Sequence, residues 1–219
     1  MTSRRSLDLS LHLVIDPELC GPRSIESVVA DAVDGGVRSV QLRDTAADAA
    51  SLLHRLEQLA TVIGGRSALL LHDRVDVAIA ARVRGIAVDG VHLAQGDTSP
   101  TDARELLGDE AIIGLTANTE QHVAELRRIP RRDVDYLSVG VIRQHAETRH
   151  RLPVLGVGGF ASFAAEAELP CVAVGGITLA DVRALREAGA AGIALDSDVC
   201  AAPDPRAVVA EFAAAWRNR

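Results

Sequence analysis

The stretch Val172-Ala173-Val174-Gly175-Gly176-Ile177-Thr178 joins a short apolar segment to two glycines, and a run with helical spacing, Leu179 to Ala188, follows at once. Glycines at the end of a strand let backbone amides approach a phosphate, and the N-terminus of the next helix adds a positive dipole. A tight turn without any ligand has the same local sequence. The stretch therefore predicts a strand, a turn and a helix, with Gly175 and Gly176 as candidate phosphate-binding residues.

The same alternation of strand and helix continues along the whole chain. Eight short apolar segments are expected to be strands: Leu11 to Ile15, Ser39 to Leu42, Ala68 to Leu71, Gly90 to Leu93, Ala111 to Leu115, Asp135 to Val139, Cys171 to Val174 and Gly192 to Leu195. Segments with apolar residues at helical spacing lie between them, such as Ser24 to Val33, Asp48 to Ile63, Thr119 to Arg128, Leu179 to Ala188 and Pro205 to Arg217. Buried strands that alternate with helices pair in parallel through right-handed crossovers. Eight such units predict a closed barrel.

The length fits this α/β architecture. A (β/α)₈ TIM barrel takes roughly 250 residues and can be as short as about 200, and the chain has 219. No Pro-, Ser- or Gly-rich stretch separates two parts, so we expect one domain over residues 1–219. An open doubly wound sheet is the alternative, but its dinucleotide-binding form carries G-x-G-x-x-G after the first strand. The residues after Ile15 lack that motif.

Composition excludes several partners. The net charge is −7 and aromatic residues make up 2%, which is unlike a nucleic-acid-binding surface. No segment reaches the roughly 18 apolar residues that a membrane span needs, so we expect a cytoplasmic protein without membrane contact. Cys20, Cys171 and Cys200 lack C-x-x-C spacing, which argues against a disulfide framework or a zinc site.

The chain contains no lysine, and all 23 basic residues are arginine. Schiff-base catalysis needs a lysine amine and is therefore excluded. Arginine offers a planar, permanently charged fork that suits phosphate oxygens. An anion in this barrel must be held by arginine, backbone amides, hydroxyls or a metal ion.

Polar side chains follow most of the predicted strands, where the active sites of (β/α)₈ barrels lie. If Leu42 packs against the helices, then Gln41, Arg43 and Thr45 point toward the barrel mouth. The other polar strand ends are His72-Asp73-Arg74, His92 to Asp97, Thr116 to Asn118 and Asp196-Ser197-Asp198. The expected ring is mixed in sign and centred on Asp73 and Asp97.

Several of these runs, taken in order, resemble the thiamine phosphate synthase family and its thiazole tautomerase branch. The runs are Leu13 to Asp16, Gly36-Val37, Val40 to Asp44, Leu71 to Asp76, Gly90 to Asp97, Ile113 to Thr116, Asp135 to Leu137, Val172 to Ile177 and Ala190 to Ala194. The resemblance covers nearly the whole chain. It makes a stronger case for the superfamily than for one activity.

The resemblance implies that hydroxymethylpyrimidine pyrophosphate is joined to thiazole phosphate with release of pyrophosphate, with Mg²⁺ as cofactor. Asp73 and Asp97 match the family's metal-binding carboxylates, and such hard oxygen ligands suit Mg²⁺. Gln41, Arg43 and Thr116 match residues that contact the pyrimidine diphosphate. Arg43 and Thr116 are also candidate catalytic residues. Gly176 and Ser197 match the thiazole-phosphate pocket, and a homodimer is a family-level expectation. The alternative for the two aspartates is that Asp73 caps the next helix and Asp97 caps a turn.

The chain departs from the family at the diphosphate. The resemblance leads us to expect a lysine where Thr45 stands and an asparagine where His72 stands. It also implies a G-P-x-F-x-T-x-T-K loop after the sixth strand, where this chain reads Gly140 to Arg151 without lysine or the threonine pair, and Val83 to Val88 resembles a short insertion. Three interpretations stay open: Arg143, Arg149 and Arg151 reach the same diphosphate, only the monophosphate end still works, or the loop is a solvated charge run.

Two further functions remain as alternatives. The tautomerase branch moves a proton on a thiazole phosphate carboxylate without Mg²⁺, and its loop histidine would fall at Val141, so His145 or His72 would have to act as the base. His72 is otherwise a hydrogen-bonded histidine of the rim. A catalytically silent phosphate-binding or regulatory protein is the third function.

The polarity and length of Val141 to Leu152 are typical of a mobile lid.

Overall fold

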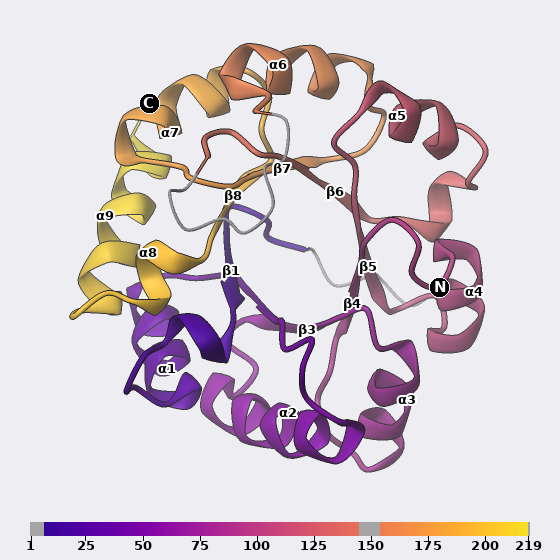
Figure 1. Ribbon diagram of the computed structural model, residues 1–219, viewed down its shortest axis with the longest axis vertical. Coiled ribbons are helices and arrows are strands. Elements are labelled where there is room, and N and C mark those ends of the chain that lie inside the picture. The colour runs from indigo at the N-terminus through magenta and orange to yellow at the C-terminus, as the bar shows by residue number, and fades with distance from the viewer. Residues whose placement is uncertain (1–6, 145–153, 219) are drawn as a thin grey trace.

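The computed structural model describes residues 7–144 and 154–218. Its eight parallel strands pair in sequence order and close into a barrel, and Figure 1 shows the helices outside the ring of strands. The strands are β1 (Leu11–Ile15), β2 (Ser39–Leu42), β3 (Ala68–His72), β4 (Gly90–Leu93), β5 (Ile112–Thr116), β6 (Tyr136–Gly140), β7 (Cys171–Val174) and β8 (Gly192–Leu195). The predicted (β/α)₈ barrel is confirmed.

The predicted strand bounds hold for β1, β2, β4, β7 and β8, and the other three reach further toward the carboxyl end. Strand β3 includes His72, while β5 and β6 begin and end one residue later than predicted. The sequence patterns stop at the last apolar residue, but parallel pairing needs only backbone groups. Thr116 and Gly140 are therefore still paired, with Ser138 and Val174.

Helices follow the strands and form the outer layer. They are α1 (Ile25–Gly35), α2 (Ala49–Ile63), α3 (Val75–Val83), α4 (Pro100–Leu107), α5 (Glu120–Leu126), α6 (Gly156–Glu166), α7 (Leu179–Glu187), α8 (Ser197–Cys200) and α9 (Pro205–Arg217), with 3₁₀ turns η1 (Pro17–Leu19) and η2 (Arg131–Asp133). Helix α9 packs against α1 and α7, which closes the outer layer. The five expected helices are present.

Capping residues set the ends of these helices. Thr178 is the N-cap of α7 and forms a capping box with Asp181, as its position predicts. Thr119 is the N-cap of α5, which ends at Leu126, so the prediction of a helix up to Arg128 was too long. After Leu126 the α-helical pattern gives way to i→i−3 bonds, from the Arg128 N–H to Glu125 O and from the Ile129 N–H to Leu126 O.

Side chains of the strands alternate between the two faces of the barrel wall. Outward side chains such as Leu13 and Leu42 pack against helix residues such as Leu56 in the main core. A smaller apolar cluster, including Leu70 and Tyr136, fills part of the barrel interior. Since Leu42 packs outward, its neighbour Gln41 lies inside the barrel, where it is buried.

The segment before β1 closes the amino-terminal end of the barrel. Leu7 and Leu9 pack into the interior cluster, and Ser10 O accepts a hydrogen bond from the Ile193 N–H. Chemistry is thereby confined to the opposite end, where the strands finish. Within residues 7–144 and 154–218, no helix combines the length and the apolar character that crossing a membrane requires.

Candidate active site

His72 lies at the centre of a charged cluster at the carboxyl ends of β1 to β4. Burial lowers the pKa of His72 first, and the positive charge of Arg43 lowers it further, while the carboxylates of Asp97, Asp73 and Asp16 oppose this shift. The structure therefore brings these side chains together, as predicted for all of them except Asp16. Asp16 follows β1, and its position at a strand end was the signal that could have identified it.

Asp73 and Asp97 lie close enough for their charges to interact. The pKa of Asp73 is raised by burial and then by the negative charge of Asp97. Asp73 has a left-handed backbone, with φ of 60°, which is uncommon for a residue other than glycine. Its N–H donates to His92 O at 2.8 Å, which fixes it beside the end of β4.

The capping alternative fits one of the two aspartates. Helix α3 has Arg74 at its N-cap position without a side-chain cap, so Asp73 does not cap it. Asp97 Oδ2 accepts a hydrogen bond from the Ala94 N–H at 2.6 Å and so closes a turn. The carboxylate of Asp73 thus has no capping role, whereas the carboxylate of Asp97 stabilises a turn and also lies at the rim of the barrel.

The two carboxylates suit a hard divalent cation that is completed by other ligands. Among the residues that the structure describes, no group of three or more His, Cys, Asp or Glu side chains is placed to hold a metal ion. Mg²⁺ is usually bound through one or two carboxylates, with water and substrate phosphates as the remaining ligands. A cation between Asp73 and Asp97 would relieve the repulsion that raises the pKa of Asp73.

Arg43 lies on the exposed side of this cluster. Its Nη1 is 3.3 Å from Asp16 Oδ2, and about half of its side chain is exposed (49%). The guanidinium makes one contact with that carboxylate, so the rest of the fork is available to an anion at the barrel mouth.

Two hydrogen-bonded chains inside the barrel lead to the rim. One runs from Ser39 through His12 and Gln41 to His72. The other joins Tyr136 Oη to His92 Nδ1 at 2.9 Å and His92 Nε2 to Thr116 Oγ1 at 3.0 Å. Gln41 and Thr116, both predicted as substrate contacts, are therefore anchored from below by buried histidines.

Gly175 and Gly176 follow β7, and the loop that follows β6 packs directly against them. The Ile142 N–H donates to Val174 O and the Arg143 N–H donates to Gly175 O, at 3.0 and 2.9 Å. A Cβ on Gly176 would lie 2.6 Å from Arg143 O, and φ is 61° there. Both glycines are thus required by the close approach of this loop, whatever they bind.

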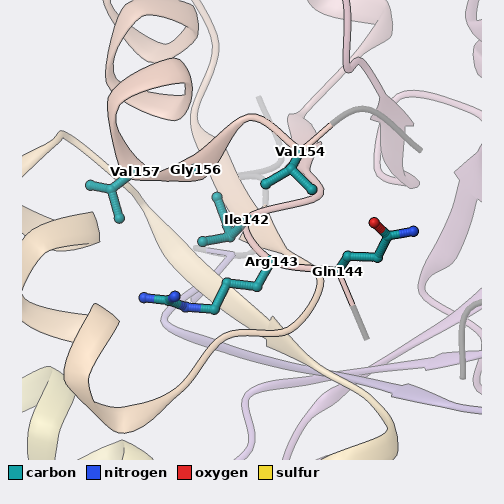
Figure 2. A pocket seen from close by; sticks show the side chains of 6 residues that line it. All are labelled: Ile142, Arg143, Gln144, Val154, Gly156 and Val157. Atoms are coloured by element: carbon teal, nitrogen blue, oxygen red, sulfur yellow. The ribbon is translucent and has the colours of Figure 1, made fainter. Parts of the chain in front are cut away.

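A cavity of about 470 Å³ lies between this loop and the start of α6, lined by Ile142, Arg143, Gln144, Val154, Gly156 and Val157. Figure 2 shows the side chains of Arg143 and Gln144 pointing in different directions. The Arg143 guanidinium binds Asp181 at the start of α7, with Nη2 to Oδ1 at 2.6 Å. Its predicted contact with a diphosphate would require it to leave or share that carboxylate.

Ser197 is the first residue of α8, at the end of β8. Its N–H donates to Asp196 Oδ1 at 2.7 Å, and its hydroxyl lies 3.3 Å from the same oxygen. The predicted phosphate contact of Ser197 remains a prediction. His145, Arg149 and Arg151 lie outside the described residues, as does most of the Val141 to Leu152 loop.

Comparison with known proteins identifies the family. A sequence model described as thiamine monophosphate synthase matches residues 11–199. The chain belongs to this family. The thiamine-phosphate synthase of Psychrobacter sp. is 36% identical over 90% of this chain and 91% of its own, and that of Laribacter hongkongensis is 37% identical over 95% and 96%.

The fold agrees with this assignment. The solved structure of thiamine phosphate pyrophosphorylase from Pyrococcus furiosus superposes with a TM-score of 0.80 at 26% identity, over 96% of each chain. A 3-hexulose-6-phosphate synthase, at 16% identity and a TM-score of 0.63, shares the fold alone.

Proposed function

We propose that this protein is a thiamine phosphate synthase that joins hydroxymethylpyrimidine pyrophosphate to thiazole phosphate. The bond between the pyrimidine methylene and the pyrophosphate oxygen breaks, and the thiazole nitrogen forms a new bond to that methylene. The proposal rests on membership of the family and on relatives that carry this name. The structural observation that best supports it is the pair of interacting carboxylates, Asp73 and Asp97, at the mouth of the barrel.

Such a reaction depends on stabilising the charge of the leaving group more than on a general base. Mg²⁺, held by Asp73 and Asp97, would supply positive charge to the departing pyrophosphate. Arg43 adds a permanently charged fork beside this pair, and the Thr116 hydroxyl adds a hydrogen bond from β5. The absence of lysine leaves arginine as the side chain for this task.

The other end of the mouth is proposed to hold the thiazole phosphate. Gly175 and Gly176 follow β7, and Ser197 follows β8, so backbone N–H groups and one hydroxyl gather at the ends of neighbouring strands. Arg143 lies next to the glycines through the hydrogen bond of its N–H to Gly175 O. A phosphate there would replace the contacts that Asp196 makes with Ser197.

His72 favours the synthase over the tautomerase. Gln41 Nε2 lies 3.1 Å from His72 Nδ1, and an amide nitrogen can only donate, so the Nδ1 lone pair is used. The neutral ring, which its lowered pKa favours, then carries its proton on Nε2. His72 is thus a hydrogen-bond donor to substrate, not a base.

A thermal-shift panel with both substrates, each with and without Mg²⁺, tests the assignment. Thiazole phosphate is expected to raise Tm without metal, and hydroxymethylpyrimidine pyrophosphate only with it, because ligands that bind the folded state stabilise it. Aromatisation of a thiazole phosphate carboxylate without metal would favour the tautomerase. If neither substrate shifts Tm, the protein is a silent member of the family.

A further inference from the structure

Ser39 is the fixed end of the hydrogen-bonded chain that leads to His72. Its side chain is fully buried in β2, and Oγ lies 2.6 Å from His12 Nδ1. No other partner of this hydroxyl is found in residues 7–144 and 154–218. A buried hydroxyl must donate its proton to avoid the cost of an unpaired donor, so the Ser39 hydroxyl donates to His12 Nδ1.

His12 transmits this direction to Gln41. It is buried, and burial lowers its pKa to about 4, so the ring is neutral at pH 7. With Nδ1 accepting, its single proton lies on Nε2, which is 3.2 Å from Gln41 Oε1. The carbonyl edge of the Gln41 amide therefore faces His12.

The amino edge of Gln41 must then face the barrel mouth. One of its two protons goes to His72 Nδ1 at 3.1 Å, and the second remains for a ligand. The ring of His72 presents a further donor, Nε2–H. The opposite orientation would require the Ser39 hydroxyl to accept from His12 and leave its own proton unpaired.

We propose that His12, oriented by Ser39, is a positioning residue that fixes the Gln41 amide so that it offers the pyrimidine substrate a donor. Gln41 and His72 together then select rings with acceptor nitrogens at this edge. This inference rests on the proposed function, because it assigns the pyrimidine to the Gln41 side of the mouth. It gives the interior histidine a role in specificity, through Gln41, without contact to substrate.

Two substitutions of His12 separate positioning from folding. In His12→Gln the amide lies near the position of Nε2 and can still donate to Gln41, whereas in His12→Asn it lies near Nδ1 and cannot. We expect His12→Asn to raise KM for hydroxymethylpyrimidine pyrophosphate about tenfold, from the loss of one hydrogen bond. KM for thiazole phosphate is expected to stay unchanged, and His12→Gln to stay within about threefold of wild type.

Ser39→Ala and Ser67→Ala form a milder, matched pair in case His12→Asn does not fold. Ser67 is also buried and donates to Val37 O at 2.8 Å, before β3 at the closed end of the barrel. Ser39→Ala is expected to raise KM for the pyrimidine about threefold, and Ser67→Ala to leave it unchanged. Equal effects of the two alanine substitutions would overturn the inference.

The tautomer of His12 gives a readout that does not depend on activity. Nitrogen NMR of the wild-type protein, with the His12 signals assigned by their loss in His12→Gln, should show the proton on Nε2. A proton on Nδ1 would overturn the inference even if the enzyme couples its substrates. Wild-type protein that shows the Nε2 proton but no coupling would instead overturn the proposed function, and the specificity role with it.

Discussion

Arg143 and Asp181 form an ion pair with two hydrogen bonds, at 3.0 and 2.6 Å, that joins the loop after β6 to the first turn of α7. The same carboxylate accepts from the N–H and the hydroxyl of Thr178, at 3.0 and 2.7 Å. Asp181 thus connects the cap of α7 to the loop that follows β6. These partners, Arg143 first, hold the pKa of Asp181 well below its usual range.

Replacing Asp181 with asparagine should destabilise the protein by about 1–2 kcal/mol, since it weakens both a cap and a charged hydrogen bond. Urea unfolding measures the change. The matched control is Glu187→Gln on the same helix, whose partner Arg183 is exposed, and we expect a clearly smaller loss there because exposed ion pairs contribute little to stability. Equal losses would show that the Asp181 contacts add nothing beyond a surface pair.

The contribution of Asp181 should depend on pH. Because its pKa is lowered in the folded state, its stabilising effect is present above the unfolded value of about 3.9 and is lost as pH falls through the folded pKa. The stability difference between wild type and Asp181→Asn is therefore expected to be constant near neutral pH and to shrink below about pH 4. A difference that grows on acidification would contradict this account.

Gly176→Ala should be more damaging than a substitution at a glycine with a similar backbone. The alanine Cβ would lie 2.6 Å from Arg143 O, whereas a Cβ on Gly21, with φ of 57°, meets nothing within 4 Å. Both variants incur the left-handed backbone cost of about 1 kcal/mol, and only Gly176→Ala also displaces the loop. Urea unfolding should show a larger loss for Gly176→Ala, and a higher KM for thiazole phosphate in that variant alone. Equal losses of stability in Gly176→Ala and Gly21→Ala would show that the loop after β6 does not pack against Gly176.

Asp97→Asn should separate metal binding from folding. The asparagine carbonyl can still accept from the Ala94 N–H, and the substitution removes the negative charge that, after burial, raises the pKa of Asp73. The unliganded variant is therefore expected to be at least as stable as wild type near pH 7, and to lose the Tm increase that Mg²⁺ with hydroxymethylpyrimidine pyrophosphate gives. A variant that is less stable but keeps that increase would assign Asp97 a structural role only.

The barrel could be predicted because buried parallel strands leave a strong sequence signal. Runs such as Cys171 to Val174 are apolar on both faces, and glycine and threonine mark their ends. Strand ends that are polar, such as His72 and Thr116, carry no such signal, because backbone pairing does not depend on the side chain. The predicted strands therefore end one residue too early, at Leu71 and Leu115, and leave out His72 and Thr116, which lie at the candidate active site.

The rim residues could be predicted as a group, but not their partners. Periodicity placed Gln41 inside the barrel, and position after a strand brought Asp73 and Asp97 together. Contacts between residues far apart in sequence, such as His12 with Gln41 or Arg143 with Asp181, depend on the register and curvature of the closed barrel. Sequence spacing alone does not encode them.

Pyrophosphate release tests the central claim most directly. Wild-type protein should release pyrophosphate from hydroxymethylpyrimidine pyrophosphate and form thiamine phosphate only when thiazole phosphate and Mg²⁺ are both present. Asp73→Asn and Asp97→Asn should each slow this turnover roughly 100-fold or more. Turnover that persists undiminished after chelation of divalent metal, or in both variants, would contradict the account.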